Sequence, residues 1–415
     1  MRYLRICLIV LLCTAMIFTF FQAHAQTGKI VYVPDSFPTI QAAVNAASPG
    51  TTIVVRDGTY RENIVVEEKN DLVIRSEHGP KNTIICNTGE ASDAFIIELT
   101  ACTNIVLQGF TIVNDKDLVA HGIKIMSDKV NVTNNIIRGP NINTAVVVDT
   151  CRRIMLENNT FRETFNGIQV DRSSYCMIRA NLIIGMNNYG IHLRHNNDHN
   201  MIDHNIISSI QSTTPQIVAA GIIIDSDWNS KITFNSIVGC QVGITVNSPG
   251  ESIYLNQFVD NGKHISIQMA NTTWNSSPLD YIYDGKKFHG PLGNYWDDYK
   301  GVDQNHDGVG DTPYKISEAQ VDNYPLMEPI NSYTIISSTT QTSTTTSTTS
   351  PKTSTSTTQT ITSTASTTHT TSSYTTTSTV PTTSGPPIEV LIIAVILLLA
   401  IVLAIILYAR SRKRV

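Results

Sequence analysis

The sequence predicts an all-β fold, a right-handed parallel β-helix, in a chain that is secreted and tethered to a membrane. Three observations support this prediction: a repeat of 21 to 30 residues, short Ile- and Val-rich runs without helical periodicity, and an apolar segment near each end. A repeat of this length built from short strands is typical of a β-solenoid. Leucine-rich repeats share the period, but their LxxLxL pattern is missing from the sequence.

Asparagines mark the repeat. Each marker has an apolar residue two positions later and another three positions earlier. Stacked side-chain amides hydrogen-bond to the amides above and below them, as they do in cross-β ladders. We therefore expect the asparagines to form a structural ladder at one bend of each coil. They are Asn135, Asn159, Asn181, Asn205, Asn235 and Asn256.

A second series runs between the asparagines: a glycine or alanine followed by Ile or Val. Alternate strand residues point to one face, so this apolar residue and the one two positions later should stack in the core. We expect the glycines at the other bend, where a positive φ is needed. The expected core pairs are Ile123/Ile125, Val146/Val148, Ile168/Val170, Ile191/Leu193, Ile222/Ile224 and Ile244/Val246.

The N-terminal region predicts a signal peptide followed by a capped β-helix. Residues 1–25 combine Arg2 and Arg5, an apolar stretch and a small-x-small triplet ending at Ala25, which favours cleavage over an uncleaved anchor. The β-helix is expected over residues 26–292. Its N-terminal cap at about 34–50 holds a helical segment, residues 38–47, that would cover the exposed edge, and its coils occupy about 51–292.

The C-terminal region predicts a cap, a stalk and an anchor. Residues 293–333 are expected to form the cap. Residues 334–387 are nearly all Ser and Thr with scattered Pro, which favours a disordered stalk. Residues 388–409 are apolar and long enough for a transmembrane helix, and the basic residues 410–415 indicate a cytoplasmic tail. We therefore expect a single-pass protein of the cell membrane with its N-terminal region outside.

Charge and cysteine content exclude other classes. The net charge is −5 and the one dense basic cluster is the C-terminal tail, so we expect no nucleic-acid partner. Five cysteines remain after the predicted cleavage, at irregular spacing that does not indicate a disulfide framework. We expect them to fill the core as small apolar side chains. They are Cys86, Cys102, Cys151, Cys176 and Cys240.

Motifs near both ends of the predicted β-helix carry a family resemblance. Residues 33–35, 38–44, 49–55 and 58–63 resemble the start of pectin-lyase-like β-helix proteins, and specifically of NosD-type proteins with CASH repeats. Residues 293–299 (GNYWDDY), 303–314 and 322–326 resemble that family's closing motif. With its stalk and anchor, the chain resembles an archaeal cell-surface member. The resemblance implies either copper-site maturation, as for the founding members, or carbohydrate binding, as for many relatives.

An Asp-rich segment predicts a structural calcium site in the C-terminal cap. Oxygen ligands at the first, third and fifth positions before a glycine have the spacing of a calcium loop. Tyr314 stands where an EF-hand has its bidentate Glu, so Asp297 or Asp298 would complete the shell. The alternative is an acidic turn without metal. The predicted ligands are Asp303, Asn305, Asp307, Val309 and Asp311.

The strands of the glycine series predict a polar stripe on their outer face. Neighbouring coils stand about 4.8 Å apart. Asp149, Asp171, Arg194 and Asp225 would therefore line up, with His192 beside them. Asp171, His192, Arg194 and Asp225 are candidates for ligand binding. Asp149, Asp171, Arg194 and Asp225 are candidates for polysaccharide cleavage, with cross-strand ion pairs as the favoured alternative.

Two further patterns complete the candidate sites. Imidazole and thioether are copper ligands, so the His-rich stretch with two nearby methionines is a copper candidate. Sequons at Asn131, Asn158, Asn271 and Asn275 predict N-glycosylation. The copper candidates are His192, His195, His199, His204, Met186 and Met201.

We interpret the chain as a surface-displayed scaffold that binds an extracellular glycan or contributes to the cell envelope. The first alternative is a polysaccharide lyase or glycoside hydrolase that acts at the Asp149/Asp171/Asp225 face. The second alternative is a copper-handling protein. Whether the chain is catalytic, which glycan it binds and its oligomeric state stay open at the level of sequence.

Overall fold

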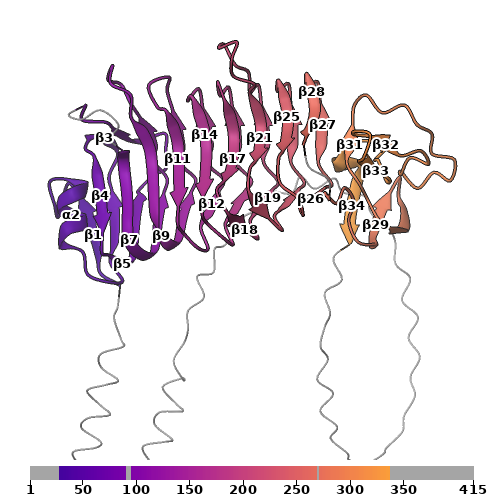
Figure 1. The fold of residues 1–415 in the computed structure, drawn as a ribbon. Helices are drawn as coiled ribbons and strands as arrows, with labels where there is room; N and C mark the ends of the chain where they lie inside the picture. The colour runs from indigo at the N-terminus through magenta and orange to yellow at the C-terminus, as the bar shows by residue number, and fades with distance from the viewer. Residues whose placement is uncertain (1–27, 90–94, 269–270, 337–415) are drawn as a thin grey trace, which may run out of the picture. The chain divides into compact units, whose positions relative to one another are not determined.

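The computed structural model describes residues 28–89, 95–268 and 271–336, which form a parallel β-solenoid (Figure 1). They belong to the first of two compact units, Met1–Thr340. The predicted signal peptide, transmembrane segment and basic tail lie outside the described residues, as does the predicted stalk from residue 337 onward. Residues 334–336, which the prediction gave to the stalk, are instead paired in a strand. Within the described part of the chain, no helix is long and apolar enough to cross a membrane.

Helix α2 (Ile40–Ala46) lies in the segment where the sequence predicts a cap, beside the first strands (Figure 1). Thr39 caps its N-terminus by accepting a hydrogen bond from the Ala42 amide at 3.0 Å, and the Glu62 carboxylate accepts from the amides of Ile40 and Gln41. These bonds satisfy amides that a helix start leaves without partners. That α2 covers the exposed end, and that the solenoid is right-handed, stay predictions.

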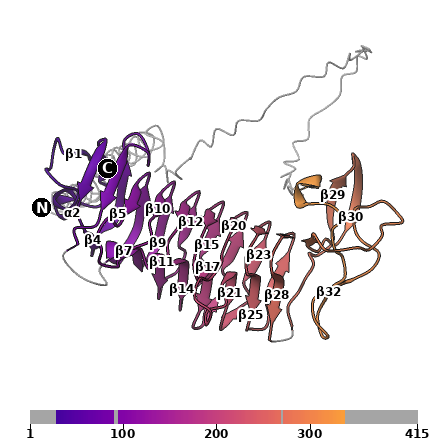
Figure 2. The same ribbon diagram turned by 90° about the horizontal axis from the view of Figure 1, so that it is seen from above.

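Each coil contributes strands to three faces, and strands of successive coils pair in parallel, side by side along one axis (Figures 1 and 2). We call the first the groove face: β4 (Ile64–Glu67), β7 (Phe95–Gln108), β9 (His121–Thr133), β11 (Thr144–Asp149), β14 (Asn166–Asp171), β17 (Tyr189–Arg194), β21 (Ala220–Ile224), β25 (Val242–Val246) and β28 (Lys263–Ile267).

The long strands β7 and β9 continue onto the second face, which also includes β1 (Ile30–Val33), β2 (Thr52–Val55), β5 (Asn70–Ser76), β12 (Met155–Glu157), β15 (Met177–Arg179), β19 (Met201–Asp203), β23 (Lys231–Thr233) and β26 (Ser252–Tyr254). The strands β18 (Asn197–Asp198) and β22 (Asp227–Trp228) form a short parallel pair. In the sequence they directly precede β19 and β23 of the second face.

The third face comprises β3 (Gly58–Arg61), β6 (Thr83–Cys86), β8 (Thr111–Val113), β10 (Ile136–Arg138), β13 (Thr160–Arg162), β16 (Leu182–Ile184), β20 (Ile206–Ser208), β24 (Ser236–Val238), β27 (Gln257–Val259) and β31 (Tyr295–Trp296). These ten strands of the described residues set the length of the solenoid at about ten coils.

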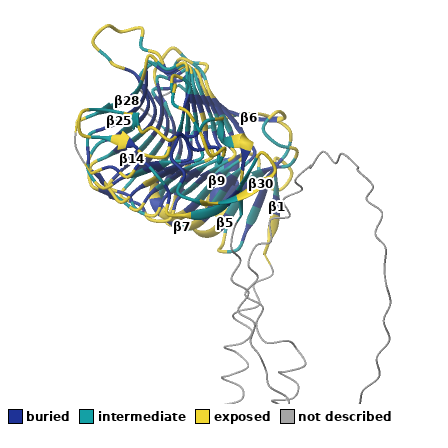
Figure 3. Cartoon of the chain, turned by 90° about the vertical axis from the view of Figure 1, so that its right-hand side faces the viewer, coloured by how far each residue is buried: buried dark blue, intermediate teal, exposed yellow. Residues whose placement is uncertain are grey.

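The core of the solenoid is a set of apolar stacks, seen as the buried interior in Figure 3. On the groove face, Val146 pairs with Ile168, which in turn pairs with Ile191. All the core pairs expected from the sequence are fully buried. The five expected core cysteines are buried and unpaired by disulfides as well, so this part of the prediction is confirmed.

The asparagine ladder forms as predicted, and every amide in it is satisfied. The Asn205 Oδ1 accepts from both the backbone amide and the Nδ2 of Asn181 at 3.0 Å. The Asn205 Nδ2 donates to the Ile178 carbonyl at 2.8 Å and to the Asn235 Oδ1 at 2.9 Å. The residue before each ladder asparagine is left-handed, for example His204 with φ 55°. The hydrogen bonds of the asparagine side chains offset the cost of this left-handed backbone conformation.

The ladder continues beyond the six expected asparagines. Asn256 donates to the Oδ1 of Asn294, and the Asp322 carboxylate accepts from the Asn294 amide at 2.8 Å and from the Trp296 indole at 3.1 Å. Asp322 is fully buried, and burial raises its pKa to about 6. The asparagine ladder therefore ends at the carboxyl group of Asp322, which accepts hydrogen bonds from the last asparagine.

The explanation that the sequence suggested for the glycine series is wrong. Gly122, Gly167, Gly190, Gly221 and Gly243 lie within or beside strands and do not have positive φ. Instead, a Cβ on Gly190 would stand 2.6 Å from the carbonyl oxygen of Gly221, and one on Gly221 would stand 2.7 Å from that of Gly243. The glycines are needed because the backbones of successive coils approach closely at this position.

An antiparallel sheet follows the last coil. It consists of β29 (Leu279–Tyr283), β30 (Lys286–Gly290) and β34 (Tyr333–Ile336), and its residues pack on a second apolar cluster that includes Leu292 and Leu326. A second hairpin, β32 (Tyr314–Lys315) and β33 (Val321–Asp322), and the 3₁₀ turn η1 (Ile330–Ser332) complete this region.

Candidate functional site

The groove face carries a hollow of about 530 Å³ on its outer side. This volume is within the usual range for sites that bind small molecules or ligand segments. We call it the groove, and it crosses strands from β7 to β21. Its lining residues are Phe95, His121, Asn143, Thr144, Val147, Asn166, Gln169, Asn188, Tyr189, His192, Arg194 and Ile223.

Aromatic rings occupy two places in the groove. The rings of Phe95 and His121 stack with their centroids 4.8 Å apart. The ring of Tyr189 meets that of His192 edge-on at 4.9 Å, and the Tyr189 hydroxyl donates to the Gln169 Oε1 at 2.9 Å. Burial raises the pKa of Tyr189 to about 12, so its hydroxyl stays protonated at neutral pH. Such rings offer flat apolar surface with a polar edge.

Side-chain amides form a continuous row in the same groove. The Asn188 Nδ2 donates to the Asn166 Oδ1 at 2.9 Å, and the Asn166 Nδ2 donates to Asn143 and Thr144 at 3.2 Å. Asn166 is buried and the other amides are half-buried. A side-chain amide has both a donor and an acceptor group. The row can therefore donate hydrogen bonds to hydroxyl groups and accept hydrogen bonds from them.

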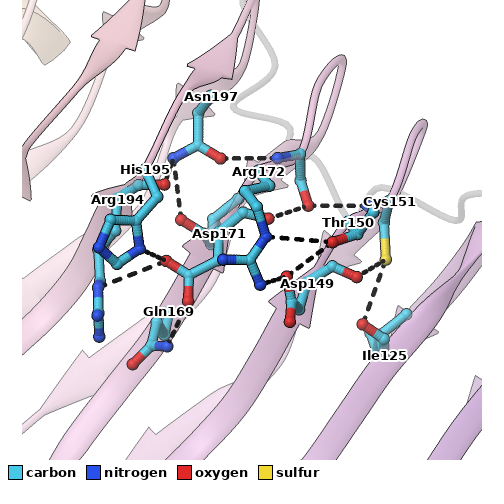
Figure 4. Close-up of polar contacts among 12 residues, drawn as sticks. Ile125, Asp149, Thr150, Cys151, Gln169, Asp171, Arg172, Arg194, His195 and Asn197 are labelled. Carbon is cyan, nitrogen blue, oxygen red and sulfur yellow. Dashed lines mark hydrogen bonds and ion pairs between the residues drawn. The ribbon is translucent and has the colours of Figure 1, made fainter.

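Asp171 is the centre of a network that positions Arg194 (Figure 4). Its carboxylate accepts from the Gln169 amide at 2.8 Å and contacts the Arg194 Nε at 3.4 Å and the His195 Nδ1 at 3.1 Å. Asp171 therefore holds Arg194 through its Nε, and Arg194 lies in the lining of the groove.

His192 forms a second pair with Asp225. Its Nε2 lies 2.7 Å from the Asp225 Oδ2, and the other Asp225 oxygen accepts from the Asn247 amide at 2.6 Å. Burial lowers the pKa of His192 despite this acid. This shift favours the neutral imidazole. Asp225 engages its Nε2 and its Nδ1 is buried, so His192 contributes its ring to the groove lining.

Three members of the predicted polar stripe are in register: Asp149 pairs with Asp171, and Asp171 with Arg194, while Asp225 follows the last paired residue of β21. The acids of the stripe, however, all have partners. Asp149 binds Arg172 at 2.5 Å, Asp171 binds Arg194 as expected, and Asp225 binds His192. No carboxylate is among the residues that line the groove. Of the four predicted ligand-binding residues, His192 and Arg194 reach the groove, while Asp171 and Asp225 support them.

Sequence reasoning missed most of the groove. Asn143, Asn166 and Asn188 each lie one or two residues before the glycine series, so their recurrence was a signal in the sequence. His121 precedes Gly122 as Asn166 precedes Gly167, but its residue type does not recur there, and Phe95 lies before the first glycine of the series.

The predicted calcium loop satisfies its oxygens internally. The Asp303 carboxylate accepts from the amides of Asp307 and Gly308 at 3.2 and 2.8 Å. The Asp307 Oδ1 accepts from the Val309 amide at 2.8 Å, and the Asp311 Oδ2 accepts from the Gln304 amide at 2.8 Å. The Asn305 Oδ1 likewise accepts from the Asp307 amide at 3.1 Å. Calcium binding by this loop stays a prediction.

The described residues include one group of three potential metal ligands. It consists of His264, Asp297 and Asp298, whose ligand atoms all lie within 4.8 Å of one another. The His264 Nε2 is 2.9 Å from the Asp297 Oδ1 and 3.4 Å from the Asp298 Oδ1. Asp297 and Asp298 thus join His264 rather than the Asp303 loop. Sequence reasoning missed His264 because its partners lie 33 residues away in a non-repeating segment.

The copper candidates of the His-rich stretch do not form one site. Each histidine has its own aspartate: His192 pairs with Asp225, His195 with Asp171, His199 with Asp198 and His204 with Asp203. The sulfur of Met186 is buried and accepts from the Thr164 hydroxyl. The donor set of His264, Asp297 and Asp298 is a better fit to a divalent metal such as Cu²⁺ or Zn²⁺, because one imidazole and two carboxylates converge there.

Comparison with known proteins identifies one family. A family model described as "Periplasmic copper-binding protein (NosD)" matches residues 44–215 and 213–301. No curated protein matches the chain.

Solved structures with a similar fold include an alginate lyase from Paenibacillus sp. strain FPU-7, with 17% identity, a TM-score of 0.39 and coverage of 54% of this chain and 74% of that one. The A-module of the mannuronan C-5 epimerase AlgE6 from Azotobacter vinelandii has 12% identity, a TM-score of 0.32 and coverage of 56% and 71%. The pectate lyase Pel9A has 13% identity, a TM-score of 0.33 and coverage of 56% and 72%.

Proposed function

Because the chain belongs to the NosD family of parallel β-helix proteins, we propose that it is a cell-surface scaffold that binds a polysaccharide segment in the groove. The family is described as periplasmic, which is consistent with a location outside the cytoplasm. The predicted stalk and transmembrane segment would hold the β-helix at the outer surface.

The combination of rings and amides in the groove carries this proposal. The Phe95–His121 stack offers flat apolar surface, and the row from Asn143 to Asn188 offers hydrogen-bond donors and acceptors. Sugar rings have apolar faces and hydroxyl edges, so they suit both kinds of surface. Successive coils repeat about every 4.8 Å, so the groove presents similar groups along its length to a chain-like ligand.

Arg194 favours an acidic polysaccharide. Its Nε is held by Asp171, while Lys124 is neutralised by Glu98 at 2.9 Å. A guanidinium binds a carboxylate through charge-assisted hydrogen bonds. We therefore infer that a uronate-type carboxylate contacts Arg194.

Binding is favoured over cleavage because every acid of the stripe is already bound by a basic or amide group. A glycosidase needs one carboxyl group as acid and another as base or nucleophile beside the scissile bond. Asp171 and Asp225 lie behind the groove lining, where they hold Arg194 and His192 instead.

The test uses the full chain in detergent and a panel of neutral and acidic polysaccharides, following both retention and new reducing or unsaturated ends. Arg194→Gln should weaken retention of an acidic polysaccharide about tenfold. Arg172→Gln is the matched control, because Arg172 lies on the same face but outside the groove lining and should leave binding unchanged.

Equal effects of the two arginine substitutions, or no retention of any polysaccharide, would contradict the proposal. Formation of products that Asp225→Asn abolishes would make the protein an enzyme and replace the binding scaffold.

A second candidate function, copper binding, is favoured by the family model and by the group around His264. The imidazole and two carboxylates would hold Cu²⁺ at the junction of the last coil and the C-terminal region. The full chain should bind one Cu²⁺ by spectroscopic titration, and His264→Ala should abolish this binding. His289→Ala is the control, because His289 is exposed and contacts only Asp280 and no second acid. Undiminished binding in His264→Ala would exclude this site.

A further inference from the structure

In addition to the asparagine ladder, the interior holds a second polar ladder of small neutral side chains. The Cys102 amide donates to the Ser127 Oγ at 2.9 Å, and the Cys151 amide donates to the Ser173 Oγ at 3.0 Å. The Ser173 amide donates to the Asn197 Oδ1 at 2.9 Å. The next rung is Asp227, which pairs with Asn197 in register. This ladder therefore ends in an acid.

A third ladder lies next to it and also reaches an acid. The Cys176 amide donates to the Asn200 Oδ1, the Asn200 amide to the Ser230 Oγ and the Ser230 amide to the Glu251 Oε2, each at 2.9 Å. Because Ser252 bridges to Thr273, Thr272 is the rung after Glu251. The third ladder thus places a carboxylate between two hydroxyls.

The two acids meet inside the solenoid without a counter-charge. Asp227 and Glu251 are both fully buried, and their side chains contact each other. Ser230, Asn200 and the Trp228 amide lie around Asp227 without meeting hydrogen-bond geometry, and no ion pair joins a basic side chain of the described residues to either acid. Burial raises the pKa of both acids. Two buried carboxyl groups in contact cannot both stay ionised unless a cation lies between them; otherwise they must share a proton.

The surrounding oxygens favour a cation. Both oxygens of Asp227 and the Oε1 of Glu251 lack a hydrogen-bond partner, and so does the hydroxyl of Thr272, the next rung after Glu251. Thr272 is 9% exposed. A buried polar group without a partner destabilises the folded state. A proton shared by the two acids satisfies one pair of oxygens and leaves the others, whereas one cation can bind several of them.

We propose that Asp227 and Glu251 bind a buried Ca²⁺ ion, with the hydroxyl of Thr272 as a neutral ligand. Two carboxylates balance the charge of a divalent ion, and Ca²⁺ accepts six to eight oxygen ligands in flexible geometry. Mg²⁺ fits less well, because it demands strict octahedral geometry and retains several waters. The ion would lie inside the coils, apart from the groove, the Asp303 loop and His264, and would act on stability.

The experiment measures bound calcium by mass spectrometry and the unfolding temperature of the full chain in detergent, in calcium and after exposure to a chelator. The wild-type chain should retain one calcium more than Asp227→Asn, and the chelator should lower its unfolding temperature by about 5 °C. Glu251→Gln keeps an acceptor for the Ser230 amide but lacks the charge, so its unfolding temperature should not respond to the chelator.

Asp303→Asn is the control for the surface loop. Loss of the chelator-sensitive calcium in Asp303→Asn, with its retention in Asp227→Asn and Glu251→Gln, would overturn the proposal. An unfolding temperature that is insensitive to chelator in the wild type, but falls with rising pH unless Glu251 is replaced by Gln, would overturn it in favour of a shared proton.

Discussion

The asparagine ladder and the two ladders that end at Asp227 and Glu251 have the same geometry and opposite chemistry. In both, a backbone amide of one coil donates to a side chain of the next. An asparagine also donates in turn, so Asn205 passes the pattern on to Asn235. A carboxylate only accepts, so its neighbours receive nothing from it. An amide rung can be repeated, whereas an acid rung passes no hydrogen bond on. Asp322 is such a rung at the end of the asparagine ladder, and Asp227 and Glu251 differ from it because they meet as a pair.

The largest expected effect comes from breaking the amide ladder in its middle. Asn205→Ala leaves the Asn181 amide buried without its acceptor and removes the side-chain donor to the Ile178 carbonyl. We expect the free energy of unfolding to decrease by about 4 kcal/mol, measured by chemical denaturation. Asn187→Ala, outside the ladder, should change it by less than about 0.5 kcal/mol. Similar losses in both variants would show that the ladder adds nothing specific.

The acid that ends the amide ladder should produce a smaller, pH-dependent effect. Burial raises the pKa of Asp322 from 3.8 to about 6, so folding favours its protonated form. Its contribution to stability is therefore fully present below about pH 4, is lost as the pH rises through 6, and is constant above. The loss amounts to about 3 kcal/mol.

Asp322→Asn tests this contribution by denaturation at several pH values. The difference in unfolding free energy between wild type and variant should change between pH 4 and 6 in favour of the variant. A difference that is constant over this range would contradict the assigned pKa.

The smallest effect is expected in the neutral part of the second ladder. Ser173→Ala removes the acceptor of the Cys151 amide and should lower the free energy of unfolding by about 1–2 kcal/mol. Ser173→Cys should lose less, because Cys151 already accepts from the Ser127 amide in the same ladder at 3.3 Å. Equal losses in both variants, by thermal or chemical denaturation, would show that the acceptor itself is unimportant.

The repeat made the core and the amide ladder predictable. Equivalents of Ile168 and Asn181 recur in the same local pattern in coil after coil, at intervals of 21 to 30 residues for the asparagines, so they could be aligned without a structure. The role of the glycines was not predictable in this way, because the 2.6 Å approach at Gly190 is a contact between coils. The same limit applies to His264, whose acids belong to a segment outside the repeat.

The groove was predictable only in part. Arg194 and His192 were found because they occupy outward positions of regular strands. The pairing of Asp225 with His192 rather than Arg194 depends on side-chain reach, which a register alone does not give. Asp227 and Glu251 were not predicted as a site, because each is a single acid at a ladder position that small neutral residues occupy in other coils.

The asparagine ladder has a consequence for how such a protein changes length. Each rung gives the next the same set of bonds, so a tandem duplication of residues 182–205 would insert one complete coil without altering either terminus of the stack. The solenoid would grow by one strand spacing, about 4.8 Å, for 24 added residues. Coil number is thus a modular variable, and the reach of the scaffold can be adjusted in discrete steps by copying a segment of the gene.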